Sequence, residues 1–193
     1  LQISRLLLGT YHGVNELGIY TTVHILAATF LILPASVKTL LFPTISNLMK
    51  EEGNIAKIKN YVYKCERYIS IILLPLIITL GFFSKEVITI LLGDEFTEGS
   101  FTLSLLCFWV YVDGTKSPFG MQLVGMDRLG LSVIIGSITI FIHIILNVLL
   151  IPNEINGVKL AGMGMEGAAV ASILSILVLA FLYRFAVYKL YGT

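Results

Sequence analysis

The sequence predicts an all-α fold, a polytopic bundle of transmembrane helices, and three observations support this prediction. The mean hydropathy of the 193 residues is +0.90. Only 13% of the residues are charged, whereas a soluble domain has about 25%. Apolar runs of the length that crosses a bilayer core, about 20 residues, follow one another along the chain. The net charge of +1 offers no basic excess, so we expect no nucleic-acid partner.

The apolar runs divide the chain into six segments, and a helix is the expected structure for each. A segment inside a bilayer must satisfy its own backbone hydrogen bonds, and the alternation with period two that marks a β-barrel is absent. The first run is too short to cross alone, so we interpret it as the end of a truncated span in a longer protein. The expected segments are 1–11 for the truncated span and 18–48, 68–92, 100–124, 129–151 and 164–187 for five full spans.

Basic residues gather in three places that share one side of the membrane if every full span crosses it. These places are the loop after the second segment, the short loop after the fourth and the end of the sixth. Their eight basic residues are Lys50, Lys57, Lys59, Lys64, Arg67, Arg128, Arg184 and Lys189. The opposite loops hold two, Lys85 and Lys159. By the positive-inside rule we expect a multi-pass protein of the cell membrane whose C-terminus is cytoplasmic.

The loop 50–67 has an amphipathic pattern of its own. Apolar residues recur there at spacings of three or four, as on one face of a helix. They are Ile55, Ile58, Val62, Cys65 and Ile69, and lysines occupy the other face. We expect an amphipathic linker helix on the cytoplasmic membrane surface, in contact with anionic lipid or a partner protein. A plain connector that carries basic residues would show the same pattern.

Five ionisable residues lie deep in the predicted spans, where a charge costs roughly 2.5–3.5 kcal/mol on insertion scales. They are Arg5, Lys38, Asp113, Lys116 and His143. Asp113 and Lys116 are three residues apart, so a helix places them on one face, where they can neutralise each other. We expect a water-filled cavity of net positive character, in which Arg5, Lys38 and Lys116 bind an anionic substrate. Asp113, His143 and Asn147, one turn after His143, are candidates for gating or ion coupling.

Each of these residues also has a purely structural interpretation. The long side chains of Lys38 and Arg5 can reach the membrane interface, and Arg5 can pair with Glu16. His143 can be a neutral side chain bonded to a carbonyl or hydroxyl group, and Asn147 can bridge two helices. The charged pair in the fourth segment can be a structural ion pair that closes a kink.

Three prolines and a glycine mark candidate hinges. Pro34 and Pro43 interrupt the second segment and Pro118 the fourth, and each removes a helical hydrogen bond. Gly114 stands four residues before Pro118, so its carbonyl loses the usual donor. Broken helices at membrane depth recur in transporters, where they line cavities. Static kinks that aid packing are the alternative interpretation.

The sequence shows neither a catalytic constellation nor the spacing of a metal site. The string “LLGDEF” is interpreted as a helix end with Gly93 as its cap. The glycine-rich string “GVKLAGMGMEG” lacks the preceding strand and the lysine–hydroxyl pair of a phosphate loop. We therefore expect a protein that is not an enzyme and that uses no metal and no cofactor.

Five short strings stand in a fixed order along the chain. They are “RLLLGTYHGVNELGIY” (5–20), “FPTISNL” (42–48), “LLGDEF” (91–96), “LNVLLIP” (146–152) and “GMEGAAVAS” (164–172). This ordered set covers essentially the whole chain and resembles the C-terminal half of polysaccharide flippases of the Wzx type, within the multidrug/oligosaccharidyl-lipid/polysaccharide exporter superfamily. Such proteins often carry Asp just before the Arg that opens the first string, and here that place is Ser4.

The resemblance implies two six-helix halves, of which the chain 1–193 would be the second. It implies a flippase that moves a lipid-linked oligosaccharide, a polyprenyl-diphosphate sugar, across the cytoplasmic membrane by alternating access for surface polysaccharide biosynthesis. The implied partners are this glycan lipid, membrane lipids and polysaccharide synthesis proteins. One alternative is a cation-coupled multidrug or metabolite exporter of the same superfamily, which the basic excess among the deep charges disfavours. A second is a membrane-bound glycosyltransferase or polysaccharide ligase, which the short outer loops disfavour.

Overall fold

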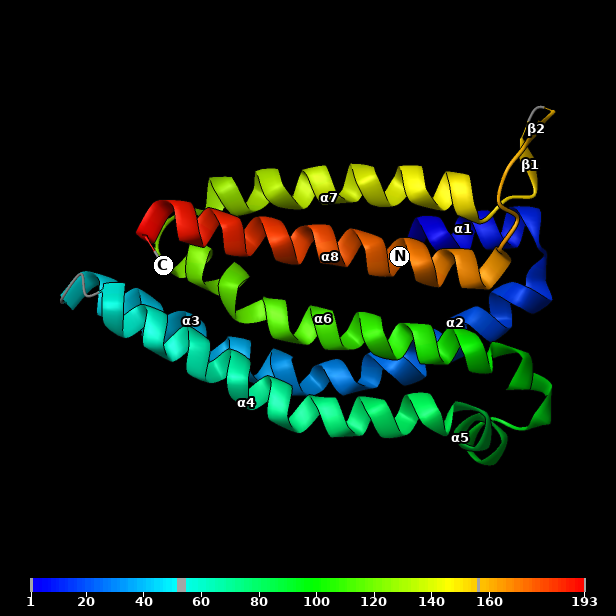
Figure 1. Ribbon diagram of the computed structural model, residues 1–193, viewed down its shortest axis with the longest axis horizontal. Coiled ribbons are helices and arrows are strands. Elements are labelled where there is room, and N and C mark those ends of the chain that lie inside the picture. Colours follow the sequence, from blue (N-terminus) through cyan, green and yellow to red (C-terminus); the bar gives the residue numbers. More distant parts are fainter. Residues whose placement is uncertain (1, 52–54, 156, 193) are drawn as a thin grey trace.

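The computed structural model describes residues 2–51, 55–155 and 157–192, and they form a bundle of long helices aligned along one direction (Figure 1). The predicted all-α fold is confirmed, since the strands of the described chain form a hairpin of only two residues each. The elements are α1 (Gln2–Tyr11), α2 (Val14–Ala28), the 3-10 helix η1 (Thr29–Leu31), α3 (Ile32–Glu51), α4 (Ile55–Phe82), α5 (Ser84–Leu91), the 3-10 helix η2 (Asp94–Gly99), α6 (Ser100–Gly125), α7 (Leu129–Leu150), β1 (Glu154–Ile155), β2 (Val158–Lys159) and α8 (Gly164–Tyr191).

Four helical segments of the described chain are long and apolar enough to cross a membrane. They are Val14–Lys50, Ile55–Phe82, Leu129–Leu150 and Gly164–Tyr191. Helix α6 has 26 residues, enough for a span, but it does not belong to this apolar set. The multi-pass architecture is therefore established, whereas five full spans and one truncated span stay a prediction.

Helix α4 joins two segments that the sequence pattern separates. Residues 55–67, expected as part of a separate linker, form the first half of α4 and continue without a break into the apolar run. Residues 55–74 contain neither glycine nor proline, so nothing in this stretch breaks the helical backbone. Residues 52–54 of the expected linker lie outside the described residues. The apolar run itself ends earlier than expected, because Phe83 leaves the helical conformation and separates α4 from α5.

The connections lie at two ends of the bundle (Figure 1). One end, called the basic end below, holds the α3–α4 and α6–α7 connections and the C-terminus. Its basic residues include Lys50, Lys57, Arg128, Arg184 and Lys189. The other end, the acidic end, holds the α1–α2 turn, α5, η2 and the strand pair, with Asp94, Glu95, Glu98 and Glu154.

Helix α6 is the central element. It packs against α2, α3, α4 and α8 and takes part in both hydrophobic cores. Trp109 belongs to the core that includes Tyr20, and Phe119 belongs to the core that includes Ile45. Polar side chains on α6 are therefore surrounded by protein rather than left to lipid.

Helices α7 and α8 approach each other closely at the acidic end. The small residues Gly164, Ala168, Ala171 and Ser175 recur at helical spacing on α8, and all four are buried. A methyl group on Gly167 would lie only 2.6 Å from the carbonyl oxygen of Leu150. Small residues thus let the two backbones meet, as is usual between membrane helices.

Candidate functional site

An ion pair inside α6 is the first feature of the site. Lys116 Nζ lies 3.0 Å from Asp113 Oδ1, and their side chains are 13% and 18% exposed. The spacing of three residues places both on one helix face, as the sequence predicts. Mutual neutralisation lowers the cost of keeping both charges away from water.

Side chains from two other helices surround this pair. Lys38 of α3 lies within electrostatic range of both Asp113 and Lys116. Lys116 Nζ also lies 5.9 Å from the centre of the Tyr183 ring of α8, at the outer limit of a cation–π contact. Lys116 binds the Asp113 carboxylate and Lys38 lies within its electrostatic range, so two lysines and one aspartate leave the cluster with a net positive charge.

Helix α6 lacks one backbone hydrogen bond near the pair, and a serine hydroxyl group replaces the missing donor. Pro118 cannot donate to the carbonyl of Gly114, and the Ser117 hydroxyl donates to that oxygen instead, at 2.8 Å. Figure 1 shows α6 changing direction toward its C-terminal end. The bend therefore falls in the part of α6 that holds the charges.

Two of the candidate hinge residues face each other across helices. A methyl group on Gly114 would lie 2.7 Å from Leu73 Cδ2 and 3.5 Å from Pro34 Cγ. Pro34 stands in the first turn of α3, directly after η1, where its missing amide hydrogen matches the change from α to 3-10 geometry. Pro43 lies farther along, inside α3.

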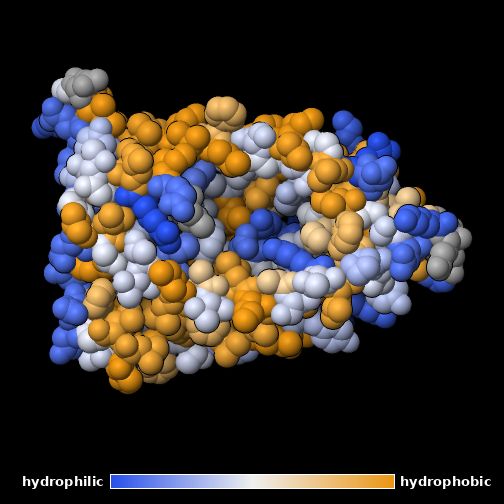
Figure 2. Space-filling view, turned by 180° about the vertical axis from the view of Figure 1, so that it is seen from behind, coloured by the Kyte–Doolittle hydropathy of each residue, from blue (hydrophilic) through white to orange (hydrophobic). Residues whose placement is uncertain are grey.

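The surface of the bundle contains a polar hollow. Figure 2, which shows the face opposite to that of Figure 1, has hydrophilic side chains gathered in a depression between apolar margins. A hydrophilic hollow in an apolar face is the arrangement that a transporter needs to carry a polar group past hydrocarbon.

A second polar cluster joins α1, α7 and α8. His143 Nδ1 lies 3.0 Å from Ser175 Oγ, and His143 Nε2 lies 3.4 Å from Ser4 Oγ. The Ser175 hydroxyl already donates to the Ala171 carbonyl, so His143 Nδ1 donates to Ser175, and in a neutral ring Nε2 accepts from the Ser4 hydroxyl. These contacts fit the neutral histidine of the structural interpretation.

Asn147 anchors the same cluster through its own helix. Its Nδ2 donates to the His143 carbonyl at 2.6 Å. Its Oδ1 is buried and has no hydrogen-bond partner among the described residues. A buried acceptor without a partner is uncommon in folded proteins.

Arg5 of α1 directly follows Ser4 of this cluster, and no described contact joins it to Lys38, Asp113 or Lys116. Its charge acts on Tyr20 and His24. The His24 ring lies 5.3 Å from that of Trp109, and neither of its nitrogens has a partner among the described residues. The structure thus divides most of the expected site residues into two groups, one around Lys38, Asp113 and Lys116 and one around His143 and Asn147.

Three of the five ordered strings meet at the acidic end, in a clamp that sequence reasoning missed. His12 Nε2 lies 2.7 Å from the Ile151 carbonyl oxygen, and His12 Nδ1 lies 3.0 Å from Glu16 Oε2. The two ring nitrogens thus connect α1 to the end of α7 and to Glu16 of α2. Glu16 Oε1 accepts the backbone amide of Met165 at 2.6 Å and so caps α8. Glu16 therefore binds His12 and Met165, whereas its suggested pairing with Arg5 is not among the described contacts.

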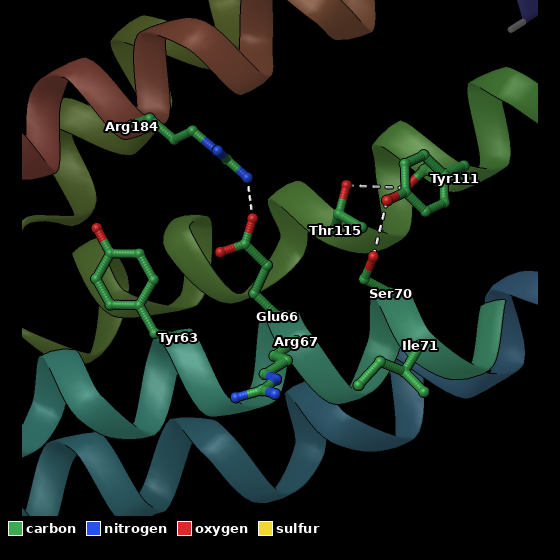
Figure 3. A pocket seen from close by; sticks show the side chains of 8 residues that line it. All are labelled: Tyr63, Glu66, Arg67, Ser70, Ile71, Tyr111, Thr115 and Arg184. Atoms are coloured by element: carbon green, nitrogen blue, oxygen red, sulfur yellow. Dashed lines mark hydrogen bonds and ion pairs between the residues drawn. The ribbon is translucent and has the colours of Figure 1, made fainter. Parts of the chain in front are cut away.

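A cavity of about 660 Å³ near the basic end is the other missed feature (Figure 3). Its lining residues are Tyr63, Glu66, Arg67, Ser70, Ile71, Tyr111, Thr115 and Arg184. Arg184 of α8 binds Glu66 of α4 across this space. The sequence placed Arg184 at the basic end, but nothing in it signalled a partner 118 positions away.

Comparison with known proteins identifies the family. A family model described as “Polysaccharide biosynthesis protein” matches residues 1–100, just over half of the chain. The chain belongs to this family. The matched polysaccharide biosynthesis segment includes α1, α3 with Lys38, and the first half of the acidic-end clamp.

A curated relative agrees with this family. The chain is 24% identical, over 172 residues, to the probable low-salt glycan biosynthesis flippase Agl15 of Haloferax volcanii. The alignment covers 89% of this chain and 34% of that protein, so the chain spans about a third of the relative's length. No solved structure matches the chain significantly. The resemblance to Wzx-type polysaccharide flippases is thus confirmed for the family.

Proposed function

We propose that the chain is the C-terminal half of a flippase that moves a lipid-linked oligosaccharide, a polyprenyl-diphosphate sugar, across the cytoplasmic membrane. Transport would proceed by alternating access and serve surface polysaccharide assembly. The basic end, with residues 50–67 and the C-terminus, would face the cytoplasm, where polysaccharide synthesis proteins deliver the substrate. The family and the printed function of the relative support this proposal.

The observation that carries the proposal is the Asp113–Lys116 pair at the weakened part of α6. In one state Asp113 holds Lys116. In the other, the diphosphate of the substrate competes for Lys116 and for Lys38, because a phosphate oxygen is a strong acceptor for an ammonium group. The Gly114–Pro118 stretch and Pro34 supply the bend that such a change requires, with Pro43 as a second bend in α3.

The second cluster is proposed to couple transport to an ion. Asn147 Oδ1 offers acceptor capacity on α7, one turn from His143, whose ring can exchange a proton with the Ser4 hydroxyl. Arg5, beside this cluster, would keep a second positive charge for the substrate. Ser4 occupies the place where related proteins often carry Asp, and its burial against His143 puts that position inside the cluster.

The test uses two double variants of the full-length protein. Asp113→Asn with Lys116→Gln removes both charges and leaves no unpaired charge behind. We expect normal membrane insertion, lost polysaccharide export and accumulation of lipid-linked glycan on the cytoplasmic leaflet. Asp113→Lys with Lys116→Asp keeps a pair with reversed polarity, and we expect export to be lost as well. Export retained in the reversed pair would show a structural ion pair and refute the substrate-binding role.

A further inference from the structure

The cavity between α4, α6 and α8 carries a chemistry that the transport proposal does not use. Figure 3 shows Arg184 reaching from α8 toward Glu66 of α4, with the Ser70 and Tyr111 hydroxyl groups nearby. Ser70 Oγ and Tyr111 OH lie 2.7 Å apart, and the Thr115 hydroxyl donates to the Tyr111 carbonyl. Guanidinium and hydroxyl donors around one open space are the groups that bind phosphate oxygens.

Arg184 is oriented by its partners, but most of its N–H donors stay available for a ligand. Its guanidinium binds one oxygen of Glu66 and lies 4.9 Å from the centre of the Phe119 ring of α6. The side chain is nonetheless 52% exposed, and a guanidinium has five N–H donors in a planar fork. Contacts with two helices thus orient a fork whose remaining donors face the cavity.

Arg67 adds a second cation to the same lining. It follows Glu66 in α4 and is exposed. Among the described residues it has no ion-pair partner. The lining therefore has two arginines and one glutamate, which leaves a net charge of +1.

The residues that surround the cavity indicate a membrane lipid as the source of the phosphate. Exposed tyrosines surround the basic end, namely Tyr61, Tyr63, Tyr68 and Tyr188. Tyrosines are enriched at the level of the lipid headgroups in membrane proteins. Lys59 and Lys64, in the same part of α4, add positive charge at this level, and anionic headgroups are attracted to such clusters.

We propose that this cavity binds the phosphodiester headgroup of an anionic membrane phospholipid. Arg184 and Arg67 would bind the phosphate oxygens, and Ser70 and Tyr111 would bind the glycerol or headgroup hydroxyls. Glu66 would compete with the phosphate for Arg184. The bound lipid would tie α4 to α8 from the membrane side, at a site distinct from the Asp113–Lys116 pair.

The experiment titrates the detergent-solubilised full-length protein with phosphatidylglycerol and counts bound lipid by native mass spectrometry. Arg67→Gln and Arg184→Gln should each weaken binding by about tenfold or more, since each removes a charge-assisted contact. Arg128→Gln is the matched control, because Arg128 is exposed at the same end but does not line the cavity. Glu66→Gln should strengthen binding several-fold, because it frees Arg184. A merely structural Arg184–Glu66 pair would not give that gain.

Three further ligands distinguish the source of the phosphate. Phosphatidylcholine and inorganic phosphate should bind at least tenfold more weakly than phosphatidylglycerol. Equal binding of phosphatidylcholine would overturn the anionic-lipid proposal, and equal binding of inorganic phosphate would show a free-anion site. Loss of polyprenyl-diphosphate binding in the Arg67 and Arg184 variants, with phosphatidylglycerol binding intact, would assign the cavity to the transport substrate instead.

Discussion

Helices α6 and α7 follow each other in the chain and have similar lengths, yet they differ in composition and in place. Helix α7 reaches a mean hydropathy of 2.5 over its most apolar window, of which 17% is buried. It buries three of its 22 residues, whereas α6 buries 13 of its 26. Helix α6 holds the ion pair, a proline and a buried glutamine, Gln122, and falls outside the apolar set.

The difference shows what hydropathy measures in this bundle. Side chains of α7 that point away from the bundle must be apolar if lipid surrounds them, and this gives the helix its high mean hydropathy. Helix α6 is enclosed by α2, α3, α4 and α8, and its charged pair and its Ser117 hydroxyl group have partners within the protein. The central helix is therefore less apolar than α7, and the ion pair proposed to take part in transport lies on it.

The largest effect should follow from breaking the charge balance of α6. Lys116→Met leaves the largely buried Asp113 carboxylate with only Lys38 in range, and we expect a loss of about 3 kcal/mol in unfolding free energy. Unfolding of the purified full-length protein in detergent–SDS mixtures measures this. Lys159→Met, in the exposed strand pair, is the control and should change stability by less than about 0.5 kcal/mol. A loss below about 1 kcal/mol for Lys116→Met would show that water already solvates the pair.

The next effect compares two glycines, one at the α7–α8 contact and one on α7 alone. Gly167→Ala brings a methyl group against the Leu150 backbone, which cannot yield as a side chain can, so we expect a loss of about 1–3 kcal/mol. No described atom lies within 4 Å of a methyl group at Gly136. Gly136→Ala should therefore be neutral or stabilise the protein by up to about 1 kcal/mol. The same unfolding assay decides, and equal effects at the two positions would refute the close α7–α8 contact.

The contrast between α6 and α7 also explains what could be predicted from the sequence. The all-α fold, the grouping of basic loops at one end and the proximity of Asp113 to Lys116 follow from composition, span counting and helical spacing. Those patterns are local, and a helix repeats them without reference to its neighbours.

Contacts between helices could not be predicted from composition, span counting or helical spacing. The Arg184–Glu66 pair and the His12–Glu16 clamp depend on how α4, α7 and α8 are placed in space. The division of the deep charges into two clusters depends on the same placement. The continuity of α4 was missed because a change from amphipathic to apolar composition was interpreted as a boundary, although no helix-breaking residue marks one.

A smaller effect tests the repaired bend of α6. Ser117→Ala removes the hydroxyl group that serves the Gly114 carbonyl, which Pro118 cannot replace. We expect a loss of about 1 kcal/mol, the usual value of one net hydrogen bond. Ser137→Ala on α7 is the control, since Ser137 is exposed. If both variants unfold alike, the carbonyl of Gly114 must have another donor, such as water entering the bend.

The smallest effect compares one aromatic residue on each helix. Phe119 of α6 is 2% exposed, meets the Tyr63 ring edge-on at 5.8 Å and supports Arg184. Phe119→Leu should cost about 1 kcal/mol, because an aromatic pair and a cation–π contact are lost while most of the volume is kept. Phe141 of α7 is 67% exposed, so Phe141→Leu exchanges one apolar surface for another and should change stability by less than about 0.5 kcal/mol. A large loss at Phe141 would mean that another part of the full-length protein covers α7, and the high hydropathy of this helix would then reflect a protein interface instead of lipid.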